Sequence, residues 1–147
     1  MLSDTKTILL VEDSPDDRFL FEHAWREAGI RHPLRAVGGG KAALEYLSGS
    51  GAYADRTLHP PPSLVLLDIK MPDLSGLAVL ERLRLDPALR PLPVLMMTAS
   101  TLPGDVGESY RLGANGYFIK PSSVRELVEL LLALKECWLR FNEFPTL

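Results

Sequence analysis

Residues 64–72 read Leu64-Val65-Leu66-Leu67-Asp68-Ile69-Lys70-Met71-Pro72, and they give the clearest indication of the fold class. The four consecutive apolar residues predict a short buried strand. The strand ends in one aspartate, Asp68. In an open parallel sheet, a polar residue that ends an apolar strand points into the crevice at the carboxyl edge, where ligands bind.

Four more short segments along the chain also predict strands, and longer amphipathic segments follow them. We predict strands over 7–11, 34–37, 64–67, 93–97 and 116–119, and helices over 14–29, 41–47, 75–85, 102–112 and 122–140. The strand at 7–11 is apolar throughout from Ile8, as expected of a central strand covered by helices on both faces. Strands that alternate with longer amphipathic segments predict successive βα units and a mostly parallel α/β sheet.

The helix after the first strand has clear start and stop signals. Ser14 is a natural N-cap, Pro15 suits the first helical position, and Gly29 is a C-terminal stop. Two acids, Asp16 and Asp17, favour the positive end of the helix dipole. We predict that its inner face consists of Phe19, Leu20, His23 and Ala24.

Two segments depart from the alternation. Residues 48–62 contain Gly49, Gly51 and three consecutive prolines, so we predict an exposed insertion loop there. Residues 141–147 form a C-terminal tail. The helix over 102–112 is weakened by Pro103 and by two glycines. Neither segment separates two self-sufficient cores, so residues 1–147 are predicted to form one domain.

Composition excludes several classes of function. The 147 residues are 46% hydrophobic and 24% charged, with a formal net charge of −3, so a nucleic-acid partner is not expected. No apolar run approaches the roughly 20 residues that cross a bilayer. Cys137 is the single cysteine, and residues 1–6 lack a signal-peptide pattern, which together predict a cytoplasmic protein.

Chemistry-bearing residues follow four of the predicted strands. Glu12 and Asp13 follow the first, Asp68 the third, Thr98 the fourth and Lys120 the fifth. Carboxylates that converge at one edge of the sheet need a cation, and oxygen ligands of this kind suit Mg²⁺. The sequence therefore predicts a magnesium site at the carboxyl edge.

These residues lie in motifs that resemble the receiver domain of two-component response regulators. The matching stretches are Val11-Glu12-Asp13, Leu66-Leu67-Asp68-Ile69-Lys70-Met71-Pro72, Met97-Thr98-Ala99 and Gly113-Ala114-Asn115-Gly116-Tyr117-Phe118-Ile119-Lys120-Pro121. The resemblance extends from Thr7 to about Leu134. It implies a flavodoxin-like fold, with a doubly wound five-stranded parallel sheet in the order 2-1-3-4-5 and helices on both faces.

The resemblance also implies a role for each residue. Asp68 accepts a phosphoryl group from a sensor histidine kinase. The metal ligands for Mg²⁺ are Asp13, Asp68, Glu12 and the Lys70 backbone carbonyl. Thr98 and Lys120 bind phosphoryl oxygens, and Tyr117 is the switch aromatic. The expected protein is a signalling phosphoacceptor and not an enzyme, although it assists its own Mg²⁺-dependent phosphoryl transfer and autodephosphorylation.

Finer features resemble the small stand-alone regulators that partner phytochrome-type histidine kinases. These features are the insertion over 48–62, the Ala99-Ser100 continuation and the ending after Trp138-Leu139. The apolar residues of the last helix span an arc of roughly 200°, wider than one sheet face requires. We therefore expect a homodimer through this helix and its neighbouring strand. The alternative is that the tail over 141–147 folds back and covers the apolar excess.

Two other functions are compatible with parts of this pattern. A phosphorylation-independent docking module would keep the fold and lack the phosphorylation cycle. A Mg²⁺-dependent phosphohydrolase with an aspartyl-phosphate intermediate would carry a second acid two residues after its nucleophile. Lys70 stands at that position, which disfavours the phosphohydrolase.

Overall fold

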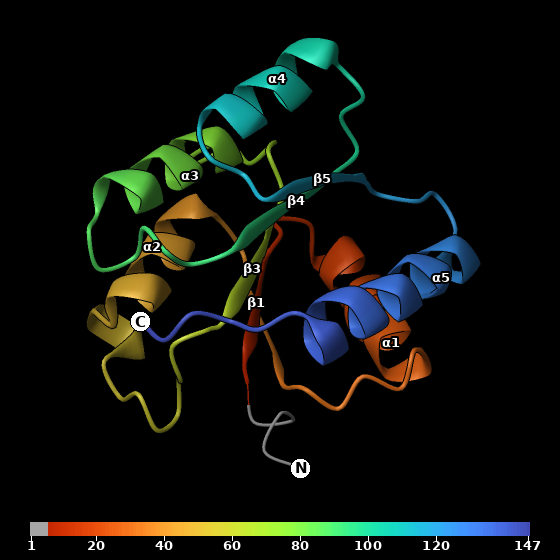
Figure 1. Ribbon diagram of the computed structural model, residues 1–147, viewed down its shortest axis with the longest axis horizontal. Coiled ribbons are helices and arrows are strands. Elements are labelled where there is room, and N and C mark those ends of the chain that lie inside the picture. Colours follow the sequence, from red (N-terminus) through yellow and green to blue (C-terminus); the bar gives the residue numbers. More distant parts are fainter. Residues whose placement is uncertain (1–5) are drawn as a thin grey trace.

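The computed structural model describes residues 6–147 and contains one five-stranded sheet (Figure 1). Its strands are β1 (Ile8–Val11), β2 (Leu34–Val37), β3 (Leu64–Leu67), β4 (Val94–Thr98) and β5 (Gly116–Ile119). All neighbours are parallel, in the order β2-β1-β3-β4-β5. The predicted fold class and strand order are confirmed. Residues 1–5, which the signal-peptide argument used, lie outside the described part.

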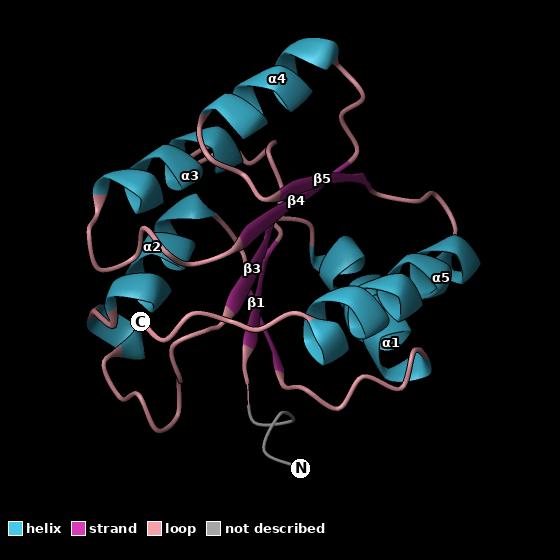
Figure 2. Cartoon of the chain, in the orientation of Figure 1, coloured by secondary structure: helices cyan, strands magenta, loops and turns pink. Residues whose placement is uncertain are grey.

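Helices cover both faces of the sheet (Figure 2). One face carries α1 (Pro15–Glu27) and α5 (Val124–Leu134), and the other carries α2 (Gly40–Ser48), α3 (Gly76–Leu85) and α4 (Pro103–Arg111). Each strand is only four or five residues long and is flanked by a helix, so the residues just after the strands reach the same edge. Among residues 6–147, no helix has the length and apolar character that a membrane crossing requires.

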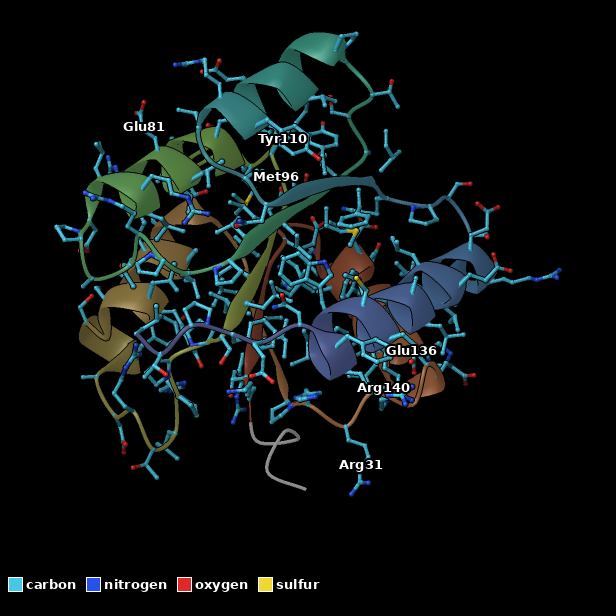
Figure 3. The ribbon with its side chains drawn as sticks, in the orientation of Figure 1. Arg31, Glu81, Met96, Tyr110, Glu136 and Arg140 are labelled. Atoms are coloured by element: carbon cyan, nitrogen blue, oxygen red, sulfur yellow. The ribbon has the colours of Figure 1, made fainter. Side chains whose placement is uncertain are left out.

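Alternate strand residues enter two separate cores. Leu9, Val65 and Met96 pack with α2 and α3, whereas Ile8 and Leu66 pack with α1 and α5. All five are at most 1% exposed. This alternation follows from the two-residue period of a strand. Figure 3 shows Met96 inside the molecule, between the sheet and the helices.

The predicted inner face of α1 is wrong. Phe19 and Leu20 are 65% and 41% exposed, and His23 is half-buried. The helix is rotated so that another apolar stripe, at positions i, i+3 and i+4, faces α5. The buried residues of α1 are Phe21, Ala24 and Trp25, of which only Ala24 was predicted.

A loop of one βα unit caps the helix of another. The residue before α2, Gly39, offers no side chain, and the Asp73 carboxylate accepts the N–H groups of Gly40 and Lys41 at 3.2 and 3.1 Å. A Cβ atom on Gly39 would lie 2.8 Å from the Asp73 carboxylate. Glycine at position 39 therefore allows the loop that follows Asp68 to approach α2.

The predicted insertion contains a short 3₁₀-helix, η2 (Gly51–Tyr53), which the sequence pattern did not predict. The Tyr53 ring of η2 packs against the Tyr46 ring at 5.1 Å between ring centroids, and His59 packs edge-on against both rings. The Arg56 guanidinium donates to the Tyr46 carbonyl at 2.8 Å. Residues 48–62 are therefore attached to α2 at several points.

The last helix changes its winding. The predicted helix over 122–140 is observed as α5 followed by a π-helix, η3 (Lys135–Phe141). Cys137 is exposed on η3. In the tail, Phe144 is half-buried against the α1–α5 core, with the Lys6 ammonium 5.9 Å from its ring centroid. Phe141 remains 70% exposed.

Candidate phosphoacceptor and metal site

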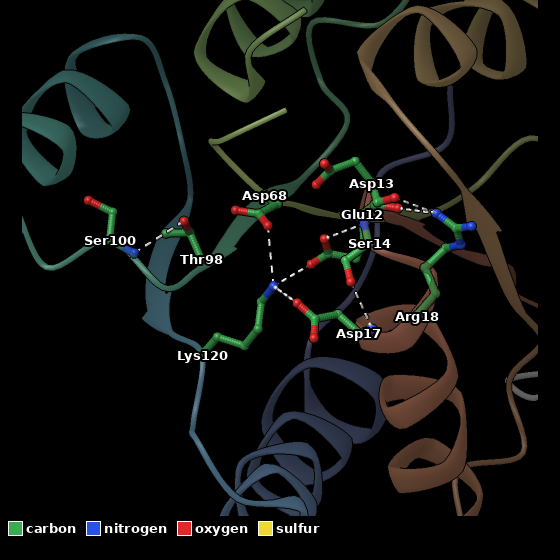
Figure 4. A network of polar contacts seen from close by, with 9 residues as sticks. All are labelled: Glu12, Asp13, Ser14, Asp17, Arg18, Asp68, Thr98, Ser100 and Lys120. Atoms are coloured by element: carbon green, nitrogen blue, oxygen red, sulfur yellow. Dashed lines mark hydrogen bonds and ion pairs between the residues drawn. The ribbon is translucent and has the colours of Figure 1, made fainter. Parts of the chain in front are cut away.

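The ends of four strands bring the predicted residues together at one edge of the sheet (Figure 4). Glu12 and Asp13 follow β1, Asp68 follows β3, Thr98 ends β4 and Lys120 follows β5. Because β1, β3, β4 and β5 are consecutive in the sheet and parallel, their final residues are neighbours. Segments far apart in the sequence thus form one polar site.

Three carboxylates form the core of this site. Glu12, Asp13 and Asp68 each offer an oxygen, and these oxygens lie within 4.8 Å of one another. Glu12 and Asp68 are only 3% and 7% exposed. Like charges at this separation and burial repel one another unless a cation neutralises them. An all-oxygen donor set with three negative charges fits a hard divalent cation such as Mg²⁺.

Lys120 supplies the positive charge in the described site. Its ammonium donates to Glu12 and, at 3.2 Å, to Asp68 Oδ2, and its side chain is 17% exposed. Burial alone would lower the pKa of Lys120, but the two carboxylates outweigh this effect and raise it. Burial raises the pKa of Glu12, against the opposing effects of Lys120 and the Ser14 N–H.

Two residues of α1 also contact groups at this edge, and the sequence pattern predicted neither of them as part of the site. The Arg18 guanidinium donates to the Glu12 carbonyl at 2.7 Å and to the Asp13 carbonyl at 3.2 Å. Asp17 lies 3.6 Å from the Lys120 ammonium. Helical side chains lean toward the N-terminus of their helix, so residues in the first turns of α1 reach back to the strand end. This rule of side-chain direction could have predicted that Asp17 and Arg18 lie near the site.

The backbone of the predicted phosphoacceptor is in close contact with α3. A Cβ atom on Gly76 would lie 2.0 Å from the Asp68 carbonyl oxygen, and the Gly76 N–H donates to the Ile69 carbonyl at 2.8 Å. Glycine at this position lets α3 begin directly beneath Asp68. Lys70 lies in the same loop with an exposed side chain, and its role as a carbonyl ligand stays a prediction.

On the other side of Asp68, Thr98 begins a chain of hydrogen bonds. The Thr98 hydroxyl accepts the Ser100 N–H at 3.4 Å, and the Ser100 carbonyl accepts the Tyr117 hydroxyl at 3.0 Å. Burial raises the pKa of Tyr117, and the charges of Asp105 and Asp68 add to the rise. Tyr117 is therefore a neutral hydroxyl donor. It contacts Ser100, which in turn contacts Thr98.

The Ser100 side chain connects this chain of contacts to α4. Its hydroxyl donates to the Asp105 carboxylate at 2.5 Å and accepts the Leu102 N–H at 3.3 Å. Asp105 lies in the first turn of α4. Ser100 thus connects the end of β4 to the start of α4 through hydrogen bonds.

Comparisons with known proteins agree with this geometry. Residues 8–132 match the family model of the response regulator receiver domain. The chain is 34% identical over 140 residues to the response regulator Rcp1 of Synechocystis sp., covering 95% of this chain and 93% of Rcp1.

Two solved structures are similar over nearly the whole chain. The phosphorylated cyanobacterial phytochrome response regulator RcpA matches with a TM-score of 0.88 and 32% identity, covering 97% of this chain and 99% of RcpA. The Mn²⁺-bound form of response regulator Rcp1 matches with a TM-score of 0.84 and 33% identity, covering 96% of this chain and 99% of that one.

Proposed function

The chain belongs to the response regulator receiver family, and on that premise we propose that Asp68 accepts a phosphoryl group from a sensor histidine kinase. The observation that carries the assignment is the position of Asp68, at the end of the central strand β3, with a carboxylate cluster on one side and the Lys120 ammonium 3.2 Å away. As a receiver, the protein is a signalling phosphoacceptor.

The chemistry of the transfer assigns a task to each group. One carboxylate oxygen of Asp68 forms a bond to phosphorus while the bond from phosphorus to the donor breaks, and the leaving group keeps that electron pair. A carboxylate is a weak nucleophile toward an anionic donor, so positive charge is needed to offset the repulsion. The Lys120 ammonium supplies part of it to the transferred oxygens.

We propose Mg²⁺ as the cofactor, held by Glu12, Asp13, Asp68 and the Lys70 carbonyl. The three clustered carboxylates support this assignment, and so does the Mn²⁺-bound structure of the relative Rcp1. When bound, the ion neutralises charge on the phosphoryl oxygens, both in transfer and in the slow autodephosphorylation that we include in the proposal.

Phosphorylation of Asp68 would be transmitted through Thr98. The added group carries about −1.5 to −2 charges and three acceptor oxygens, which attract the Thr98 hydroxyl. Movement of Thr98 disturbs the Ser100 N–H contact and, through the Ser100 carbonyl, the position of Tyr117. We propose that this is the switch that alters the surface around α4 and β5.

Labelling with a small phosphodonor tests the assignment. With Mg²⁺, acetyl phosphate should add one phosphoryl group to the wild type and none to Asp68→Asn, as measured by intact-protein mass spectrometry. Asp16→Asn, which removes an exposed acid, is the matched control and should label normally. Labelling of Asp68→Asn at the wild-type rate would refute the assignment, and absence of labelling in the wild type would favour a phosphorylation-independent docking module.

We also propose a phytochrome-type histidine kinase as the partner. The support is the similarity to RcpA, which is a phytochrome response regulator, over 97% of this chain. We place the protein in the cytoplasm, because the exposed thiol of Cys137 suits a reducing environment. A purified phytochrome-type kinase should transfer its phosphoryl group to the protein much faster than a kinase of another sensor class, and equal rates would contradict this partner.

A homodimer through α5 and the neighbouring strand β5 completes the proposal. β5 is an edge strand, and exposed apolar side chains lie on both elements: Ile119 is 47% and Leu132 45% exposed. Phe144 of the tail packs against the α1–α5 core while Phe141 stays exposed. Light scattering across concentrations should detect a dimer that tightens on phosphorylation. A monomeric mass in every condition would favour coverage by the tail.

A further inference from the structure

Lys120 has a third carboxylate neighbour that the proposed function does not use. The Asp17 carboxylate lies 3.6 Å from the ammonium, and Figure 4 shows the ammonium between Asp17, Glu12 and Asp68. Asp17 is outside the group of carboxylates that can hold one ion together, which consists of Glu12, Asp13 and Asp68. It faces the ammonium without belonging to the metal cluster.

The first turn of α1 fixes the position of this third carboxylate. The Ser14 hydroxyl caps the helix by accepting the Asp17 N–H at 3.2 Å. Asp17, Glu12 and Lys120 line the same cavity of about 310 Å³ between the starts of α1 and α5. One water occupies roughly 30 Å³, so the cavity gives the ammonium room to shift.

Metal binding and the contact between Lys120 and Glu12 compete for one carboxylate. Both of its oxygens are engaged, since Glu12 Oε1 accepts from Lys120 and Oε2 accepts the Ser14 N–H. A cation that binds Glu12 takes the negative charge that now faces Lys120 and repels the ammonium. The ammonium would then keep only Asp68 of its two hydrogen-bonded carboxylates, and a largely buried ammonium that loses such a partner is destabilised.

We propose that Asp17 is a positioning residue that holds Lys120 when a divalent cation takes Glu12. The ammonium then keeps a carboxylate partner at the cavity side and stays close to Asp68, where it is needed for the phosphoryl oxygens. The free-energy cost of separating Glu12 from Lys120 is lower as a result. Asp17 therefore increases the affinity for Mg²⁺ without binding the ion. The inference rests on the proposed function for the use of Lys120 at Asp68.

Calorimetric titration with Mg²⁺ tests this role in the unphosphorylated protein. Asp17→Asn should raise the Kd for Mg²⁺ about fivefold, the size expected for loss of one partly exposed charge pair. Asp16→Asn is the matched control, because Asp16 is an exposed acid in the same helical turn, and it should change the Kd less than twofold. Asp17→Glu keeps the charge and should restore most of the affinity. Equal effects of Asp16→Asn and Asp17→Asn would overturn the proposal.

A double-mutant cycle separates positioning from a general charge effect. In a Lys120→Met background the ammonium is gone, so Asp17→Asn should change the Kd no more than Asp16→Asn does. Additive effects of Asp17→Asn and Lys120→Met would contradict the proposal. Unfolding by urea without Mg²⁺ should show a cooperative transition for both Asp16→Asn and Asp17→Asn, which establishes that each variant is folded under the conditions of the titration.

The two claims fail separately. Phosphoryl labelling of the wild type and of Asp68→Asn tests the acceptor residue and does not involve Asp17. The titrations test Asp17 without any phosphodonor. Labelling at Asp68 with an unchanged Kd in Asp17→Asn would remove only the positioning role, whereas the expected change in Kd without labelling would remove only the acceptor assignment.

Discussion

At the scale of single residues, Asp73 links the loop that follows Asp68 to α2. Its carboxylate accepts three backbone N–H groups, from Gly40, Lys41 and Leu74, at 2.8 to 3.2 Å. These bonds, with that of Lys41 the largest contribution, hold the pKa of Asp73 below its ordinary value of 3.8. The ionised carboxylate is therefore favoured in the folded protein, and its contribution to stability depends on pH.

We predict that Asp73→Ala lowers the free energy of unfolding by about 1 kcal/mol at neutral pH, the usual size of a lost helix cap. The folded pKa is the lower one, so the stabilisation is complete above the ordinary value of 3.8 and is lost as the pH falls through the folded value. Urea unfolding over a pH series should show the wild type and variant converging in acid.

Asp73→Asn is the control for charge in that experiment. Asparagine keeps a side-chain acceptor for the cap, so this variant should retain much of the stability at neutral pH and lose the pH dependence that the carboxylate causes. A wild-type pH profile in Asp73→Asn would show that Asp73 is not the titrating group.

Residue-level sequence reasoning found the groups that end strands and missed those that come from α1. Glu12, Asp68 and Lys120 could be predicted because each directly follows a run of apolar residues, and Asp13 because it comes next after Glu12. Asp17 was read only as an acid at the positive end of a helix dipole. An acid at the start of a helix can favour the helix dipole or pair with a cation outside the helix. The sequence does not distinguish these two roles of Asp17, because the position of the Lys120 ammonium is known only from the structure.

At the scale of elements, α4 carries two glycines that its packing does not require. A Cβ atom on Gly104 or Gly107 would meet no atom within 4 Å, and neither residue has a positive φ. Glycine inside a helix costs about 0.5–1 kcal/mol relative to alanine. These glycines therefore weaken the helix whose first turn is bound to Ser100.

We predict that Gly104→Ala and Gly107→Ala each raise the free energy of unfolding by about 0.5–1 kcal/mol, measured by urea denaturation. Gly113→Ala should do the opposite. Gly113 has a φ of 101°, and a Cβ atom there would lie 2.8 Å from Arg84 Nε. Destabilisation by either alanine in α4 would mean that glycine is needed there for packing.

The elements also show where pattern reasoning works and where it cannot. Strands were predicted to within a residue. The pattern was strongest for β1, β3 and β4, which are buried throughout, because buried parallel strands are nearly continuous apolar runs. The face of α1 was wrong because the helix offers two apolar stripes at helical spacing, and packing against α5 selects the one with Phe21 and Trp25. The π-helix η3 contains neither proline nor glycine, so no residue in it predicted the change from an α-helix.

At the scale of the whole molecule, the proposed metal site joins segments that are distant in the chain. Its carboxylates follow β1 and β3, and the neighbouring ammonium follows β5. An ion that binds only the folded arrangement stabilises the entire fold, by about 2.7 kcal/mol at a hundredfold excess over its Kd. Metal binding should therefore be visible in global unfolding.

We predict that Mg²⁺ raises the urea midpoint of the wild type and that Asp13→Ala removes most of this increase. Glu12→Ala should remove less, because its longer side chain ends farther from the strand and is already engaged by Lys120. Midpoints measured with Mg²⁺ and with a chelator give the comparison. Equal losses in the two variants would contradict the ranking of the two ligands.

The exposed thiol on η3 allows a direct measurement of the proposed association through α5. Cysteine occurs once in the 147 residues, so a nitroxide reagent attaches one spin label per chain without any substitution. Cys137 lies 13 residues beyond the start of α5, which places the label about 20 Å along the helix from the end near Lys120. Two chains that associate through α5 would give a single dipolar distance, and the change in that distance on phosphorylation would report the movement of one last helix against the other.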